Sequence, residues 1–326
     1  MSLFTPTGSR WVVARQHRYA LWAVVGLVVA AAAVMISSRV WADSAVEALR
    51  AVDCTVSSTE QRCFQPARDY TDAIWAARHL IEYAALGMMA LPAIVGAFVA
   101  GPLIAREMEA GTYKLAWTQS VSPARWLAAK LTVPVGVVIM GTALLTLIFS
   151  WSWSTGPAQD FPTYWYEPTM YASIGTVPTA YAVMGLALGA LVGLLVRRTV
   201  TAMSATALII GGVLLAMSQV RVHLWPISHM TSLGEPPTAP PSRTWRIEEG
   251  ALTPSGERMS LSDCFAIPPA QQPALCKAPR GDVTHYLDHH PSSHFWPIQL
   301  VESGIVLVLA AAATYAAFRV LRRSHA

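Results

Sequence analysis

Apolar and polar residues alternate along this chain in long blocks, a pattern typical of a protein that crosses a membrane several times. A helix needs about 20 apolar residues to cross the hydrocarbon core of a bilayer. Six runs are long enough, and we predict transmembrane helices at residues 19–38, 83–105, 131–152, 171–196, 199–220 and 297–320. Charged residues make up only 13% of the chain, against about 25% in soluble domains. The expected fold class is therefore an all-α polytopic membrane protein.

The polar segments between these runs differ in length and composition. Residues 39–82 and 153–170 are expected to be outer loops, and only Arg197-Arg198 separates the fourth run from the fifth, which predicts a tight hairpin. The largest polar piece, residues 221–296, is rich in proline and histidine and predicts a small irregular outer domain before the last span. Residues 1–18, 106–130 and 321–326 are short and basic.

The distribution of charge predicts the orientation. The basic segments, the adjoining span end at Arg319 and the Arg197-Arg198 hairpin carry 12 of the 23 lysines and arginines, but only two of the 19 acidic residues, Glu107 and Glu109. Lysine and arginine accumulate on the cytoplasmic side of membrane proteins, so both termini and residues 106–130 are predicted to be cytoplasmic. The isoelectric point near 9.0 follows from this topology, and we expect no nucleic-acid partner. The excess of arginine over lysine and the abundance of alanine suggest a GC-rich bacterial genome, so the expected location is a bacterial plasma membrane.

The segment 106–130, REMEAGTYKLAWTQSVSPARWLAAK, contains signals for local structure. Gly111 is suited to end the helix that leaves the membrane, and Thr112 to cap a short helix over residues 113–119. Ser122-Pro123 then predicts the start of the next helix, with serine as cap and proline in the first turn. We interpret this segment as a helix–elbow–helix that lies at the membrane surface and is offered to a cytoplasmic partner.

This segment resembles the cytoplasmic segment of ABC-2 permeases, the membrane subunits of type V ABC exporters. The resemblance is carried by Ala105-Arg106-Glu107 followed by Glu109, Gly111 and Thr112, by the run Thr118-Gln119-Ser120-Val121-Ser122, and by Arg125 and Lys130. In that family the segment holds the coupling helix, which docks on the ATP-hydrolysing subunit.

The resemblance implies both partners and roles. An ABC ATPase subunit would bind ATP and Mg, and a second permease copy would complete a homodimer in the lipid bilayer. The residues that it assigns to ATPase coupling are Arg106, Glu107, Glu109, Gly111, Thr112, Leu115 and Trp117. Glu107 and Glu109 would pair with basic residues of the ATPase, while Leu115 and Trp117 would fill an apolar cleft. A hydrophobic, amphipathic or lipid-like substrate would move outward between two units, along a pathway bounded by their second and fifth spans.

The four cysteines agree with the predicted topology, because all of them fall in outer segments. Cys54 and Cys63 lie in residues 39–82, and Cys264 and Cys276 lie in residues 221–296. An oxidising exterior permits disulfides. Pairs within each segment, Cys54–Cys63 and Cys264–Cys276, are the first choice because they close short loops, although pairing between the two segments stays open.

Two carboxylates near the outer ends of spans, Glu82 and Glu302, are candidate pathway or gate residues, because ionisable groups at such depth can mark a substrate path. They could equally pair with neighbours such as Arg78 or Gln299. Separately, Gly185, Gly189 and Gly193 recur every four residues and predict a seam for close helix packing. That seam could serve a dimer contact or packing within one subunit.

The histidines of residues 221–296 suggest an alternative class of function. His285 and His289 are four residues apart, as are His290 and His294, and a helix with this spacing can bind a metal. Pro291 interrupts the second pair, so polar loop histidines are the favoured interpretation and no metal is assigned. The alternative function is a membrane-anchored enzyme or sensor with a histidine-rich extracytoplasmic domain.

Motifs for energy conversion and catalysis are absent from the sequence. It contains no GxxxxGK[ST] phosphate loop, no GxSxG elbow and no HExxH helix. We therefore expect a transport subunit without its own ATPase site or cofactor, to which another polypeptide supplies energy.

Overall fold

The protein is described here from a computed structural model, which describes residues 18–114, 122–154, 163–238, 244–253, 255–268 and 283–323. The chain divides into two compact units. A helical unit comprises residues up to 162, 168–216 and 303–326, and a sheet unit comprises residues 163–167 and 217–302.

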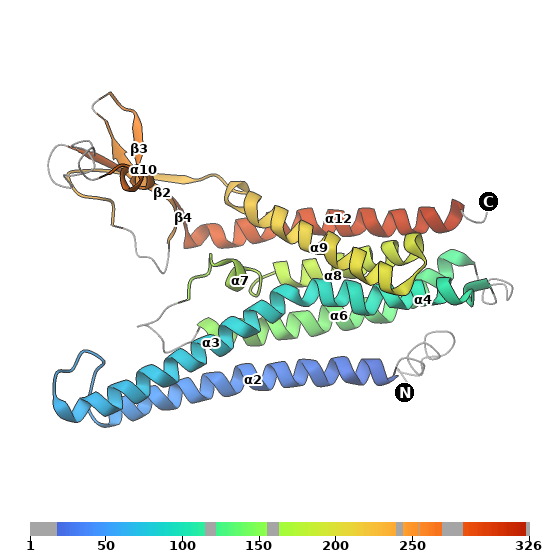
Figure 1. The fold of residues 1–326 in the computed structure, drawn as a ribbon, viewed down its shortest axis with the longest axis horizontal. Coiled ribbons are helices and arrows are strands. Elements are labelled where there is room, and N and C mark those ends of the chain that lie inside the picture. The colour runs from blue at the N-terminus through green and yellow to red at the C-terminus, as the bar shows by residue number, and fades with distance from the viewer. Residues whose placement is uncertain are drawn as a thin grey trace, which may run out of the picture. The chain divides into compact units, whose positions relative to one another are not determined.

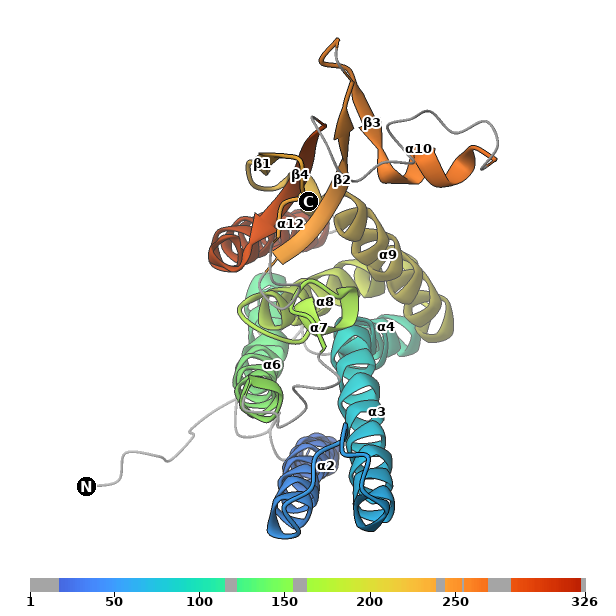
Figure 2. The same ribbon diagram turned by 90° about the vertical axis from the view of Figure 1, so that its left-hand side faces the viewer.

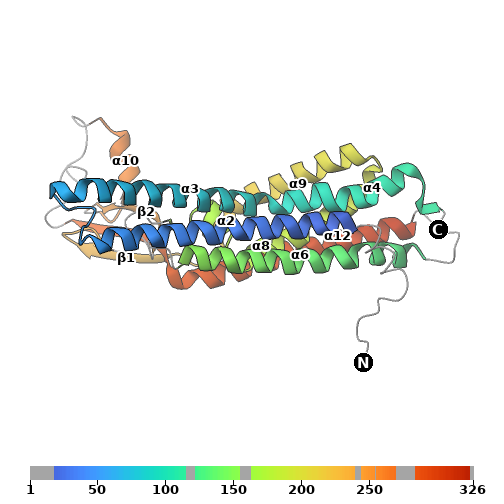
Figure 3. The same cartoon turned by 90° about the horizontal axis from the view of Figure 1, so that it is seen from below.

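Long helices that run side by side build the helical unit (Figures 1 and 3). They are α2 (Arg18–Ala51), α3 (Phe64–Ile94) with its continuations η2 (Val95–Ala100) and α4 (Gly101–Ala110), α6 (Pro123–Ser154), α8 (Val177–Val196), α9 (Thr199–Val220) and α12 (Phe295–Arg323). The short α7 (Pro168–Tyr171) precedes α8. Six helical segments of the described chain are long and apolar enough to cross a membrane, which confirms the predicted fold class.

The segment expected as the first outer loop is mostly helical, because α2 and α3 extend well past the predicted spans. A short turn ending in η1 (Gln61–Cys63) joins them, and a disulfide links Cys54 to Cys63, one of the pairings considered from the sequence. Ala42 and Leu49 of α2 pack with Tyr70 and Ile74 of α3 in a buried apolar cluster. This cluster and the disulfide hold the two extensions together as a hairpin.

The second span is one continuous helical rod with a change of winding in its middle. The backbone is π-helical over η2, between Pro92 in α3 and Pro102 in α4. Proline lacks the amide hydrogen that an α-helix needs for its i→i−4 ladder, and π-helical turns are a known way of absorbing such an interruption.

Helix α8 lies among other helices of the bundle (Figure 2) and is the most buried of the six candidate spans. It carries the glycine seam. Gly185, Gly189 and Gly193 face the backbone of the second span. A Cβ atom built on Gly185 or Gly189 falls within 3.0 Å of the carbonyl oxygen of Pro92 or Gly96, and one on Gly193 falls 2.9 Å from that of Gly101. Of the two alternatives for this seam, the structure therefore shows packing within the subunit.

The sheet unit contains four antiparallel strands in the order β1-β4-β2-β3. Their bounds are β1 (Ser228–Leu233), β2 (Thr244–Leu252), β3 (Arg258–Ser260) and β4 (Thr284–Pro291), with α10 (Leu261–Ala266) after β3. Short helical turns η3 (Arg221–His223) and η5 (Ser292–His294) complete the unit. Where the sequence predicted an irregular domain, the structure therefore has a sheet. The prediction of irregular structure relied on the prolines, but Pro236 and Pro237 lie in the connection between β1 and β2 and do not interrupt a strand.

Aromatic side chains form a second feature of the sheet unit. The rings of Tyr164, Tyr166 and Trp245 stack in sequence, with interplanar angles of 2° and 5°. Trp165 lies edge-on to both Trp245 and Phe295. These contacts attach residues 163–167, which are distant in sequence, to the rest of this unit.

Candidate functional site

The predicted coupling segment begins where α4 ends, at one end of the helical unit. Gly111 has a left-handed conformation with φ of 69° and ends the helix. Helical structure resumes at Tyr113 and Lys114, while residues 115–121, which include Leu115 and Trp117, lie outside the described part of the chain. Helix α6 begins at Pro123, where the Ser122 carbonyl accepts a hydrogen bond from the Trp126 amide at 3.0 Å. One helix therefore ends at Gly111 and the next begins at Pro123, as the sequence predicted.

Glu107 is bound by groups of its own chain. Its carboxylate accepts a hydrogen bond from the Trp126 indole nitrogen at 3.2 Å and forms an ion pair with Lys130, which is buried. Its backbone carbonyl accepts a bond from the Thr112 hydroxyl at 3.5 Å. This carboxylate therefore joins α4 to α6, whereas the sequence hypothesis had it pairing with the ATPase.

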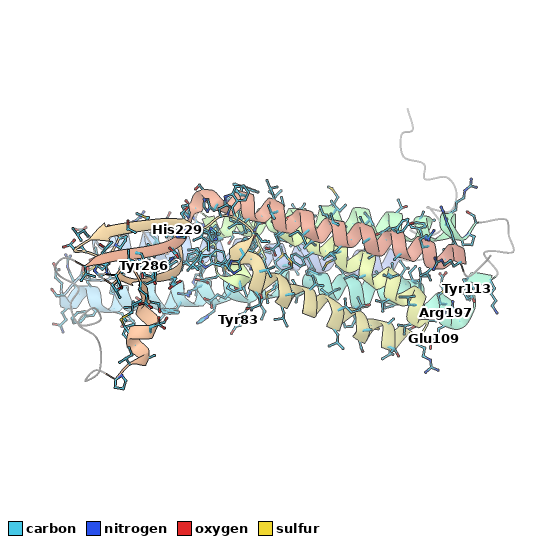
Figure 4. The ribbon with its side chains drawn as sticks, turned by 90° about the horizontal axis from the view of Figure 1, so that it is seen from above. Tyr83, Glu109, Tyr113, Arg197, His229 and Tyr286 are labelled. Atoms are coloured by element: carbon cyan, nitrogen blue, oxygen red, sulfur yellow. A yellow bond between two sulfur atoms is a disulfide. The ribbon has the colours of Figure 1, made fainter. Side chains whose placement is uncertain are left out.

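Glu109 is likewise engaged within the chain. One of its carboxylate oxygens accepts hydrogen bonds from both the amide nitrogen of Thr199, at 2.9 Å, and the Thr199 hydroxyl, at 2.7 Å. Thr199 is the first residue of α9, so Glu109 binds the positive end of that helix. Figure 4 labels Glu109 beside Arg197, which takes a left-handed conformation at the end of α8. The α8–α9 hairpin is thereby attached to α4.

The cations of this end stay available to a partner. Five of them are exposed and form no ion pair with a carboxylate among the described residues; they are Arg106, Lys114, Arg125, Arg197 and Arg198. Five exposed cations face only exposed Glu109 and half-buried Glu107, so the surface around Arg106 and Gly111 is positively charged on balance.

The two carboxylates considered as gate residues also have partners. Glu82 forms an ion pair with Arg78 at 2.7 Å and contacts His79 at 3.2 Å, all on α3. In the sheet unit, Glu302 is fully buried and forms a two-pronged ion pair with Arg221 at 2.8 and 2.9 Å. Glu302 therefore has a charge partner that the sequence analysis did not name.

Replacing Arg221 with methionine is expected to destabilise the sheet unit. The change leaves a buried carboxylate without its charge partner, which costs about 3–5 kcal/mol. The double variant Arg221→Met/Glu302→Leu should recover most of that loss. Thermal unfolding of the purified protein in detergent, followed by tryptophan fluorescence, measures both.

The control is Arg246→Met, which removes an exposed ion pair with Glu249 and should cost at most about 1 kcal/mol. Equal shifts for Arg221→Met and the control would contradict the prediction.

His229 of β1 forms a hydrogen bond across the sheet. Asp288 accepts from His229 Nδ1 at 2.6 Å and pairs with Arg258, whose guanidinium lies over the Tyr286 ring. Burial alone would raise the pKa of Asp288, but the bonds from His229 and Arg258 hold it below its ordinary value. Figure 4 labels His229 and Tyr286 in this region.

His290 is the most buried of the strand histidines. Its Nε2 donates to the Val222 carbonyl at 2.9 Å, so its Nδ1 accepts from His294 Nδ1 at 3.0 Å. Burial lowers the pKa of His290, and the neighbouring histidines act in the same direction, so the neutral form is favoured. Among the described residues, no three histidine, cysteine, aspartate or glutamate side chains lie close enough together to hold a metal ion.

Cys264 and Cys276 were the second cysteine pair considered from the sequence. Cys264 is disulfide-bonded. Cys276 lies outside the described residues.

Sequence reasoning missed the partners of three functional residues, although two had a local signal. Thr199 stands at the start of an apolar run, directly after Arg197-Arg198, which is where helix-capping residues occur. Arg221 and Glu302 are each a lone charge beside an apolar run, and such charges usually pair with one another. No sequence signal indicates that Lys130 and Trp126 meet Glu107.

The six apolar helices define a multi-pass membrane protein. A model of the family described as ABC-2 membrane transporter related matches residues 24–221, more than half of the chain, so this chain belongs to that family. No curated protein and no solved structure matches it. The family match identifies a component of a membrane transporter, and permeases of the ABC-2 family generally work with an ATPase subunit.

Proposed function

We propose that this chain is the permease subunit of an ATP-binding cassette exporter in a bacterial plasma membrane. A separate ATPase subunit would bind ATP and Mg, and two copies of the chain would form the transport unit with both termini in the cytoplasm. The substrate moved outward would be a hydrophobic or amphipathic small molecule or a lipid-like molecule.

One observation carries this proposal: the bend after α4 is tied to two other helices by its two carboxylates. Glu107 binds Lys130 and Trp126 of α6, and Glu109 binds Thr199 at the start of α9. A partner that displaces residues 106–122 would therefore move α4, α6 and α9 together. Among these are parts of the second and fifth spans, which we propose to line the substrate pathway.

The surface charge indicates how the ATPase would be recognised. Glu107 and Glu109 are bound by groups of their own chain, and they are outnumbered at this surface by exposed cations such as Arg106, Lys114 and Arg125. We therefore propose an acidic docking face on the ATPase, with charge complementarity setting the register of the contact. Leu115 and Trp117 are proposed to add apolar contacts there.

The proposal is tested by the topology of the coupling segment and by the presence of an ATPase. In intact cells, Trp117→Cys should resist a membrane-impermeant maleimide and react only after permeabilisation. The control Glu47→Cys, exposed on the α2 extension, should react in intact cells. A P-loop ATPase should co-purify with the full chain and hydrolyse ATP in proteoliposomes. Labelling of residue 117 from outside, or purification of a functional transporter without an ATPase, would refute the proposal.

A further inference from the structure

A groove of about 600 Å³ lies between α8 and α12 in the helical unit. Its walls are apolar over most of its length and include Val183 of α8 and Leu307, Ala311 and Phe318 of α12. The small side chain of Ala311 leaves room there. Leu307 in the groove wall is 45% exposed and the adjacent Val308 is 68% exposed, so α12 presents an apolar outer face. In a membrane protein such a face meets lipid.

One end of the groove is polar and positively charged. It is lined by Tyr315, Arg319 and Arg322, near the basic end of α12. Residues three apart on a helix lie on the same face, so Arg319 and Arg322 converge on this end of the groove. The Arg319 guanidinium carbon lies 5.9 Å from the centre of the Tyr315 ring, and the tyrosine itself is 66% exposed.

Among the residues that the structure describes, no carboxylate pairs with either arginine of the groove. The segments predicted on the same membrane side contain only Glu107 and Glu109 as acidic residues. These carboxylates are engaged by Lys130 and by Thr199 respectively. The positive charge at the end of the groove is therefore available to an external anion.

We propose that this groove binds one anionic phospholipid of the leaflet on that side. The headgroup phosphate would lie between Arg319 and Arg322, since guanidinium groups bind phosphate through paired hydrogen bonds. An acyl chain would lie against Val183, Leu307 and Ala311. Anionic lipids are concentrated in the cytoplasmic leaflet, so the identity of the lipid rests on the cytoplasmic placement of this end under the proposed function. The site is separate from the proposed pathway between the second and fifth spans.

The test is native mass spectrometry of the full chain purified from vesicles of phosphatidylethanolamine and phosphatidylglycerol. The wild type should retain phosphatidylglycerol in preference to phosphatidylethanolamine. Removing an arginine near a membrane surface weakens anionic-lipid binding by about 1 kcal/mol, or about fivefold. Arg319→Gln and Arg322→Gln should each show this loss, and the double variant a larger one. The matched control is Arg323→Gln, which removes the same charge from an adjacent position that does not line the groove.

Two further arms separate a lipid from other occupants. Ala311→Phe fills the apolar part and keeps both arginines, so it should reduce phosphatidylglycerol retention. Competition with inorganic phosphate should have little effect, because phosphate has no acyl chain. The proposal would be overturned if Arg323→Gln lost as much phosphatidylglycerol as the groove variants, or if Ala311→Phe retained as much as the wild type. Displacement of the lipid by phosphate alone would also overturn it. So would cross-linking of position 311 to a second protein chain. Lipid retention is measured without any ATPase, so this result is independent of the test of transport.

Discussion

Replacing Glu109 with lysine is expected to abolish transport-coupled ATP hydrolysis while the protein still inserts into the membrane. The substitution removes the two hydrogen bonds to Thr199 and places a cation at the positive end of α9, beside Arg198. Loss of a helix cap costs about 1–2 kcal/mol, and the unfavourable charge adds up to about 1 kcal/mol. These costs are small enough to leave the helices folded but large enough to detach α4 from α9. Substrate-stimulated ATPase activity of the reconstituted complex measures the coupling.

Two variants show whether the position or the charge is responsible. Glu109→Gln keeps one acceptor oxygen without the negative charge, so its coupling should lie between those of the wild type and Glu109→Lys. Glu47→Lys makes the same charge reversal at an exposed position of the α2 extension and should leave coupling unchanged. If Glu109→Lys kept normal substrate-stimulated ATPase activity, the contact between α4 and α9 would not be needed for coupling.

Replacing Gly189 with alanine is expected to destabilise the helical unit. The added methyl group would lie within 3.0 Å of the Gly96 carbonyl oxygen and the Ala100 side chain. Because the main obstacle is backbone, α8 and η2 would have to move apart. Overpacking of this kind costs about 1–3 kcal/mol. Thermal unfolding in detergent should show the lower melting temperature, with a parallel loss of transport activity.

The matched control is a glycine in open surroundings. Gly211→Ala adds the same methyl group to α9, where no atom lies within 4 Å of the new position. This variant should be neutral or slightly stabilising, because alanine favours a helix over glycine by about 1 kcal/mol. If the two variants unfolded at the same temperature, close packing along the glycine seam would not be a source of stability.

The helices were predictable because a bilayer imposes length and apolarity on each crossing independently of the others. Local chemistry likewise predicted the helix end at Gly111 and the helix start at Pro123. The partners of Glu107, Glu109 and Glu302 lie 23, 90 and 81 positions away in the sequence. Such pairs depend on how the helices pack, which hydropathy does not encode. Strand β4 escaped prediction because its core holds Asp288, His289 and His290 among its buried residues, so no apolar alternation reveals it.

The π-helical segment η2 divides the second span into two parts that are attached to different helices. Helix α3 is joined to α2 by a disulfide and a buried apolar cluster. Helix α4 is joined to α6 and α9 through Glu107 and Glu109. Segment η2 packs against α8, where the glycines allow the two backbones to lie in close contact. Under the proposed function, a displacement of α4 by the ATPase would therefore reach α8 through η2, while the hairpin of α2 and α3 would stay in place.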